Sequence, residues 1–184
     1  SCSPWSSRSD CGDAPMSPAS RVVVRPARTA DVKVIRGLID VYASDRRLLS
    51  KATVALYEDI TEFLVAELDG SVVGCGAVHV FWEDLAEVRT LAVDPAYVGT
   101  GIGSVLLQAL VGRARQLGVE RVFCLTFETE FFQRHGFIEI DGTPVGHDVF
   151  EQLLRSYDEG VAEFLDLERV KPNTLGNHRM LLVL

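Results

Sequence analysis

Positive charge is scarce in this chain of 184 residues. Lys and Arg together number 18, whereas Asp and Glu number 26, so the formal net charge at pH 7 is −8. A protein that binds nucleic acid over a broad surface carries an excess of basic residues, so we expect no nucleic-acid partner. Any anionic ligand must therefore be held by local groups of the chain.

Cysteine is also scarce, and Cys2, Cys11, Cys75 and Cys124 show no C-x-x-C spacing. They form no Cys/His cluster of the kind that holds zinc, so we expect no metal. The sequence also lacks an apolar run of about 18 residues and a secretory leader. We therefore expect a soluble, cytoplasmic protein with reduced thiols and no membrane partner.

Hydrophobic residues make up 47% of the chain, enough to fill the core of one domain. Residues 1–20 are rich in Ser and Pro and have no apolar period, so we interpret them as a disordered leader or a cloning remnant. The predicted domain spans residues 21–184.

Strand and helix patterns alternate along this domain. Strands are predicted at 22–26, 63–68, 72–80, 86–93, 121–126, 136–140 and 179–184, and helices at about 32–42, 52–62, 101–117, 129–135 and 147–159. We interpret the acidic run 158–168 as a solvated helix face, or alternatively as a cover of the active site. The pattern predicts an α/β fold with a mixed sheet and helices on both faces.

The most informative segment is L-A-V-D-P-A-Y-V-G-T-G-I-G-S, residues 91–104. Glycines 99, 101 and 103 lie between a strand and a helix, where they let the backbone turn sharply and present successive N–H groups to an anion. The G-x-G-x-G spacing is neither a Walker loop nor a dinucleotide fingerprint. It predicts a pyrophosphate cradle, and the alternative is a purely structural turn.

With F-F-Q-R-H-G-F about 30 residues later, residues 98–103 resemble the R/Q-x-x-G-x-G/A signature of the GNAT acetyltransferase superfamily. The resemblance runs from about residue 22 to 141. It implies a single GNAT-like α/β (α+β) domain with a twisted, mostly antiparallel sheet of about seven strands, and acetyl-CoA as the co-substrate. The cofactor-binding residues that it implies are Leu91, Ala92, Val93, Val98, Gly99, Thr100, Gly101, Ile102, Gly103, Ser104 and Phe132.

Two residues depart from the superfamily pattern. Val98 stands where an Arg or Gln is usual, so the backbone must carry more of the phosphate binding. Phe132 stands where many members have a tyrosine that protonates the leaving thiolate, so another group or water must be the acid.

The runs L-L-S-K-A-T-V-A-L-Y-E-D-I-T-E-F, A-E-V-R-T-L-A-V-D-P and F-F-Q-R-H-G-F show a narrower resemblance. They are similar to the acetyltransferase domain of N-acetylglutamate synthase, and most similar to the short actinobacterial amino-acid acetyltransferases of arginine biosynthesis. The resemblance implies direct attack by the α-amine of glutamate or glutamine, a small-molecule substrate. Superfamily members of this size are often dimers, so a homodimer is one expected state.

The α-amine must lose a proton before it attacks, so a base is needed. By resemblance Glu87 is the first choice, and the alternative is a carboxylate that is solvated or paired with Arg89. Thr129 resembles the hydroxyl proposed as the acid, and the alternative is a helix N-cap. The residues implied for substrate binding are Lys51, Arg89, Lys171, Asn177 and Arg179.

Two other functions remain open from the sequence. One is acetyl transfer to a protein N-terminus, a lysine or another small amine. The other, suggested by Val98 and Phe132, is a non-catalytic acyl-CoA-binding module.

Overall fold

The protein folds around a single sheet, seen in a computed structural model that describes residues 15–44, 51–165 and 176–184. The strands are β1 (Val23–Pro26), β2 (Phe63–Leu68), β3 (Ser71–Trp82), β4 (Leu85–Val93), β5 (Arg121–Thr126), β6 (Ile138–Ile140) and β7 (His178–Val183). Their order is β1-β2-β3-β4-β5-β7-β6, and of the described pairs β4 and β5 alone are parallel. The prediction of a mixed, mostly antiparallel sheet of about seven strands is confirmed.

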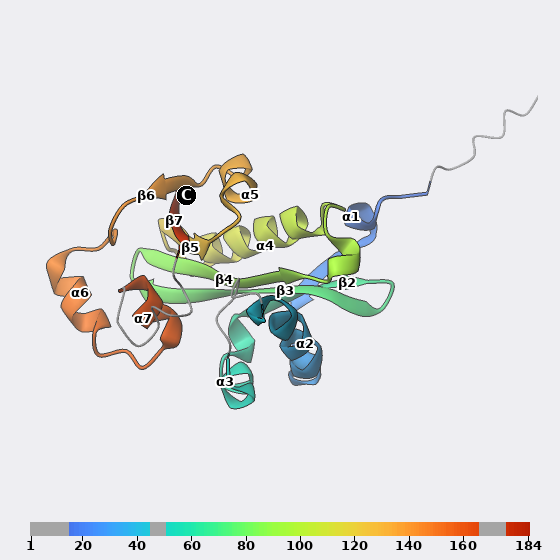
Figure 1. The fold of residues 1–184 in the computed structure, drawn as a ribbon, viewed down its shortest axis with the longest axis horizontal. Helices are drawn as coiled ribbons and strands as arrows, with labels where there is room; N and C mark the ends of the chain where they lie inside the picture. Colours follow the sequence, from blue (N-terminus) through green and yellow to red (C-terminus); the bar gives the residue numbers. More distant parts are fainter. Residues whose placement is uncertain (1–14, 45–50, 166–175) are drawn as a thin grey trace, which may run out of the picture.

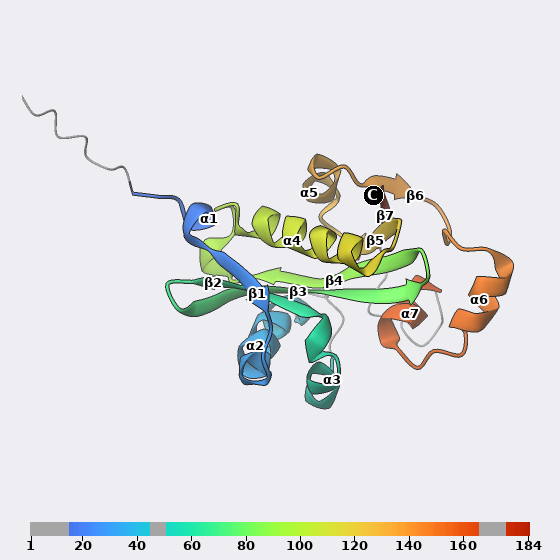
Figure 2. The ribbon, with the colours of Figure 1, turned by 180° about the vertical axis from the view of Figure 1, so that it is seen from behind.

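Helices cover both faces of this sheet, as predicted (Figures 1 and 2). They are α1 (Pro18–Arg21), α2 (Val32–Ala43), α3 (Thr53–Glu58), α4 (Ile102–Leu117), α5 (Thr129–Arg134), α6 (His147–Leu153) and α7 (Glu159–Phe164), with 3-10 turns at Thr29–Asp31, Ile60–Glu62 and Pro95–Tyr97. Helices α4 and α5 lie on one face, whereas α2, α3 and α7 lie on the other.

Each face is held by an apolar stripe of helical period. Leu106, Leu110 and Ala114 of α4 are fully buried against the sheet, and Ile35 and Ile39 of α2 are fully buried against the opposite face. Each large apolar side chain that is buried in this way contributes about 1.5–3 kcal/mol. The two stripes therefore fix α4 and α2 on opposite sides of the strands that line the site.

The helix predicted at 147–159 ends earlier, at Leu153, and a separate helix, α7, begins at Glu159. Asp158 has an extended backbone (φ −68°, ψ 131°), and its carboxylate accepts the N–H of Val161 at 2.9 Å, so it begins α7 as a cap. The interpretation of the acidic run as a solvated face is wrong for its described part, because Val161, Ala162 and Phe164 are buried. Residues 166–168 of that run lie outside the described residues.

The last three residues of the expected leader, 18–20, are helical in the structure. Pro18–Arg21 form α1, whose first turn is capped by Ser17, and α1 contacts α4. Residues 1–14 of the expected leader lie outside the described residues.

Candidate active site

Strands β4 and β5 are paired only where they begin. Their parallel pairing runs from Leu85 to Glu87 of β4. Farther along β4, Thr90 and Leu91 stand opposite the single residue Gly76 of β3, and Thr90 has a φ of +57°, which is rare for a β-branched residue. This is a β-bulge, and bulges bend the strand that carries them. An opening between β4 and β5 follows.

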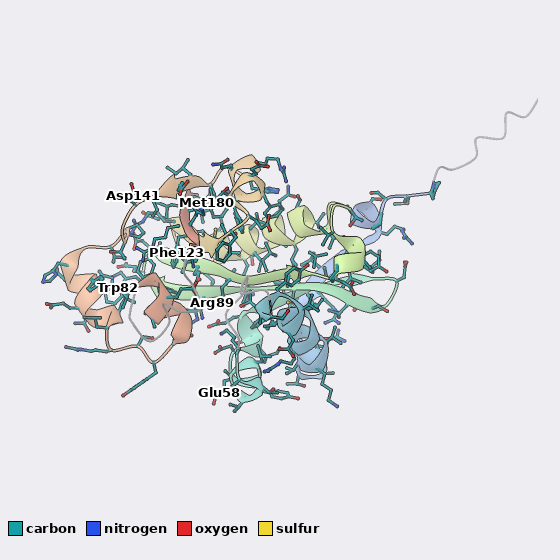
Figure 3. All side chains as sticks on the ribbon, in the orientation of Figure 1. Glu58, Trp82, Arg89, Phe123, Asp141 and Met180 are labelled. Atoms are coloured by element: carbon teal, nitrogen blue, oxygen red, sulfur yellow. The ribbon has the colours of Figure 1, made fainter. Side chains whose placement is uncertain are left out.

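The bulge also changes which side chains face which side of the sheet. Side chains normally alternate along a strand, so Leu91 would share the face of Arg89. Instead Leu91 and Val93 pack with the core beneath α4, as Val88 does, while Arg89 contacts Gly160 of α7 on the other face. Figure 3 shows Arg89 between the sheet and the helices of that face. β4 therefore places Leu91 and Val93 on the α4 face of the sheet and Arg89 on the α7 face.

A cleft of about 540 Å³ occupies the opening. A volume in this range suits a small-molecule ligand. The cleft is lined by β4 from residue 88 to 93, the loop before α4, the end of β5, and α5. The predicted cofactor-binding residues on its wall are Leu91, Ala92, Val93, Val98, Gly99, Gly101, Gly103, Ser104 and Phe132.

Two predicted cofactor-binding residues lie elsewhere. The Ile102 side chain is fully buried in the core, which leaves only its backbone for a ligand. Both the backbone N–H and the hydroxyl of Thr100 are directed to the carbonyl of Tyr97, so Thr100 stabilises the loop.

The loop before α4 presents free backbone donors. Gly99 and Gly101 have φ values of +79° and +90°, which glycine adopts without strain. The amides of residues 101–104 donate to no described part of the chain, and they lie at the N-terminus of the 16-residue helix α4. Free N–H groups and the positive end of the helix dipole together favour an anion. This geometry is what a pyrophosphate requires.

Ser104 adds a side chain to this cradle. Its Oγ lies on the cleft wall, 3.0 Å from Nε2 of His135. Burial, with a smaller effect of Arg134, lowers the pKa of His135. The contact is therefore between neutral groups at pH 7. Val98 is 64% exposed, and its side chain has no hydrogen-bond donor.

Arg89 lies on the cleft wall and is the buried centre of an ion-pair group. Its Nε donates to Glu87 at 2.8 Å, and its Nη1 donates to Asp158 at 2.9 Å. The residue is only 7% exposed, and its Nη2 has no hydrogen-bond partner in the described structure. A buried donor without a partner is costly unless a ligand completes it. Arg89 therefore offers an anion one free end of its guanidinium.

The charges around Arg89 shift one another. Burial disfavours the charge of Arg89, but Glu87 and Asp158 outweigh this effect and raise the pKa of its guanidinium. Burial raises the pKa of Glu87, against the opposing effects of Arg89 and His79. Burial acts in the same direction on Asp158, but the Arg89 bond prevails and lowers the pKa of Asp158 to about 2.

Comparison with known proteins shows where the chain belongs. Residues 38–137 match the model of the Acetyltransferase (GNAT) family. The chain belongs to the GNAT acetyltransferase family. The expectations of a GNAT domain, of an acetyltransferase and of acetyl-CoA as its co-substrate are thereby confirmed.

Individual relatives of this acetyltransferase extend the comparison. It is 62% identical to the amino-acid acetyltransferase of Mycobacterium tuberculosis over 89% of this chain and 95% of that protein. The crystal structure of Rv2747 from Mycobacterium tuberculosis in complex with CoA and NLQ matches with a TM-score of 0.85, 62% identity, and coverage of 88% and 99%. N-acetylglutamate synthase from Neisseria gonorrhoeae, complexed with CoA and N-acetyl-glutamate, matches with a TM-score of 0.70 and 27% identity, over 89% of this chain and 35% of that one.

The acetyltransferase brings only some of the predicted substrate and catalytic residues together. Glu87 pairs with Arg89 and lies beneath the cleft wall, so its reach to an acceptor amine requires a bridging water. Thr129 is the first residue of α5, whose N-cap position is Glu128, so the N-cap interpretation is wrong. The cleft wall beside it is formed by Thr126, Phe127 and Glu128.

Of the other predicted substrate residues, Asn177 and Arg179 lie near Glu163 of α7, whose carboxyl also interacts with the charge of Arg89. Lys51 Nζ donates to Asp59 at 3.2 Å, near α3. Asn177 Nδ2 donates to Glu163 at 2.7 Å, and Arg179 stands opposite Leu125 in the pairing of β5 with β7. Lys171 lies outside the described residues.

The sequence did not reveal Asp158 and Glu163 of α7 as parts of the site. Burial and the charge of Glu87 raise the pKa of Glu163 to about 8, although Arg89 opposes the shift. The acidic residues of the run 158–168 gave no indication that α7 is buried. The better signal was the apolar set within the same run, Val161, Phe164 and Leu165, which requires α7 to pack inward.

The described residues contain no group of three or more His, Cys, Asp or Glu placed to hold a metal ion. In the same part of the chain, every helix is too short or too polar to span a bilayer.

Proposed function

We propose that this acetyltransferase moves acetyl from acetyl-CoA to the α-amino group of L-glutamate or L-glutamine, the first step of arginine biosynthesis. The observation that carries the proposal is one cleft with free amides at the start of α4 and, on its wall, the incompletely paired guanidinium of Arg89. The 62% identity to an amino-acid acetyltransferase over most of both chains supports it.

The donor end of the cleft suits CoA. The amides of residues 101–104 bind the pyrophosphate, each as a hydrogen bond to a charged acceptor of about 1.5–3 kcal/mol. The pantetheine arm lies along residues 91–93 of β4, beyond the point where β5 separates from it. Backbone N–H groups of this stretch stabilise the oxyanion that forms on the thioester carbonyl.

The acceptor end suits a small zwitterion. Nη2 of Arg89 binds a carboxylate of the acceptor amino acid. The carboxylates of Glu87 and Asp158, which pair with Arg89, favour the ammonium group of the acceptor. Glu87 takes one proton from the ammonium through a bridging water. Its burial raises its pKa and makes it a better base than a solvated carboxylate.

The amine nitrogen then forms a bond to the thioester carbon, and the carbon–sulfur bond breaks as the tetrahedral intermediate collapses. Phe132 has no proton to give, so a water in the cleft carries the second proton of the amine nitrogen to the departing thiolate. Attack is direct because the cysteines described, Cys75 and Cys124, are buried and burial raises their thiol pKa values.

The test is CoA release measured with each of the twenty amino acids as acceptor. We expect turnover with glutamate or glutamine far above the other eighteen, and loss of turnover in Glu87→Gln with acetyl-CoA binding retained. A flat response across the panel would overturn the proposal. Turnover with a peptide N-terminus instead would favour a protein acceptor, and CoA binding without turnover on any amine would favour the non-catalytic module.

A further inference from the structure

Four groups fix the guanidinium of Arg89. Glu87 and Asp158 bind its Nε and Nη1, and the ring centroid of Phe81 lies 5.8 Å from its Cζ. The fourth is Gly160, the second residue of α7, whose backbone lies directly against the guanidinium. The side chain therefore has little freedom to rotate, and only Nη2 is left to meet a ligand.

Gly160 provides space that no other residue could provide. A Cβ at this position would lie 2.7 Å from Cζ and from Nη2 of Arg89, and 3.0 Å from its Nη1. Such distances are shorter than van der Waals contact, so the guanidinium would have to move. Glycine is a poorer helix former than alanine, so helix stability does not explain its presence in α7.

Asp158 connects the same helix to Arg89 in a second way. Its carboxylate binds Nη1 of Arg89 and also accepts the N–H of Val161, which caps α7. The start of α7 and the orientation of the guanidinium are therefore fixed together. Phe164, fully buried against Phe81 and Phe123, holds the other end of α7 in the core.

We propose that Gly160 and Asp158 are positioning residues that direct Nη2 of Arg89 to the α-carboxylate of the acceptor, so that the start of α7 sets the preference for acceptors that carry this carboxylate. This inference rests on the proposed function and deepens it. A displaced guanidinium therefore weakens binding of the acceptor and leaves the binding of acetyl-CoA unchanged.

The experiment compares Gly160→Ala with Gly112→Ala. Gly112 lies inside α4 with nothing within 4 Å of a Cβ, so it is a matched control for the change of residue type. Steady-state kinetics are measured with the best amino-acid acceptor and with its α-amide, which lacks the α-carboxylate. We expect Gly160→Ala to raise KM for the amino acid roughly tenfold or more, the loss of one charge-assisted hydrogen bond. KM for acetyl-CoA should stay within about twofold in both variants.

The α-amide separates positioning from a general structural effect. Wild type and Gly112→Ala should prefer the amino acid to its α-amide, and Gly160→Ala should lose most of that preference. An equal rise in KM for both acceptors, or no rise at all, would overturn the inference. The proposed function would still stand in that case, provided that wild type turns over the amino acid. Absence of wild-type turnover on every amino acid would overturn both.

Discussion

His135 Nε2 lies 3.0 Å from the Oγ of Ser104 and so joins the end of α5 to the first turn of α4 at the edge of the cleft. The contact fixes the Ser104 hydroxyl beside the free amides of the same turn. The Val98 side chain has no donor for the phosphates, and the Thr100 hydroxyl donates to Tyr97, which leaves the Ser104 hydroxyl as the side-chain donor of residues 98–104 on the cleft wall.

We expect Ser104→Ala to raise KM for acetyl-CoA by about tenfold, since it removes one hydrogen bond to a charged acceptor. KM for the amino acid should not change. Steady-state kinetics with each substrate varied in turn measure both values. Ser44→Ala, on an exposed helix end, is the control. An unchanged KM for acetyl-CoA would remove Ser104 from the cradle.

Val98→Arg should strengthen acetyl-CoA binding. The side chain of residue 98 is exposed on the cleft wall, so an arginine there is placed to form a charge-assisted bond to a phosphate. We expect a fall in KM for acetyl-CoA of about three- to tenfold at low ionic strength. In about 1 M salt the fall should be smaller, because the Debye length is then only about 3 Å and exposed charges are screened. Val98→Leu should leave KM unchanged, and an equal effect of both variants would contradict this explanation.

Gly101→Ala should reduce both stability and cofactor binding. Its φ of +90° is unfavourable for alanine, at a cost of about 1–2 kcal/mol, and the new Cβ would lie 3.1 Å from the Cβ of Ala19 in α1. Urea unfolding measures the loss of stability, and KM for acetyl-CoA should rise as the loop moves. Gly112→Ala, with open space and a helical backbone, should leave stability unchanged or raise it. Equal stability of the two variants would show that the loop tolerates the strain.

Asp158→Asn should destabilise the protein in a pH-dependent way. Arg89 lowers the pKa of Asp158 to about 2, below the ordinary 3.8, so its charge stabilises the folded state at pH values above 4. Asparagine retains the helix cap but not the charge, and we expect a loss of about 2 kcal/mol at pH 7. The difference from wild type should shrink as the pH falls from about 4 towards about 2. Thermal unfolding across this range checks it, and a difference independent of pH would contradict the ion pair.

Glu163→Gln should have the opposite pH dependence. Because the pKa of Glu163 is raised to about 8 from the ordinary 4.5, the folded state holds its proton more tightly than the unfolded chain, and wild type loses stability between these pH values. Glutamine keeps an oxygen for the Asn177 amide and cannot ionise. Relative to wild type, the variant should gain stability as the pH rises from about 5 to about 8 and then stay constant. A gain that is the same at pH 5 and pH 8 would show that Glu163 is already charged.

Much of the fold could be predicted from periodicity. The apolar spacing of Leu106, Leu110 and Ala114 identifies α4 and its buried face, and alternation identifies the strands. The break between α6 and α7 could not be predicted in this way, because Leu153 and Leu154 continue a helical pattern toward it. The break depends on Asp158, whose partner Arg89 is 69 residues away.

In the candidate site, too, the features that are local in sequence could be predicted, and the contacts between distant segments could not. The loop before α4 is a local feature, so glycine spacing and the following helix indicated it. The environment of Arg89 is built by contacts between distant segments, and charge alone suggested that α7 was solvated. Thr129 and Lys51 do not line the cleft, so the roles that the resemblance implies for them stay predictions.

The single extra residue at Thr90 has a consequence for how this protein can change over evolutionary time. Removing or adding one residue between Arg89 and Leu91 would exchange the side chains that face α4 with those that face the opposite side of the sheet, beyond that point. A change of two residues would leave each side chain on its present face of the sheet. Length variation in β4 is therefore restricted to even steps, and a lineage that loses the bulge must rebuild one half of its site.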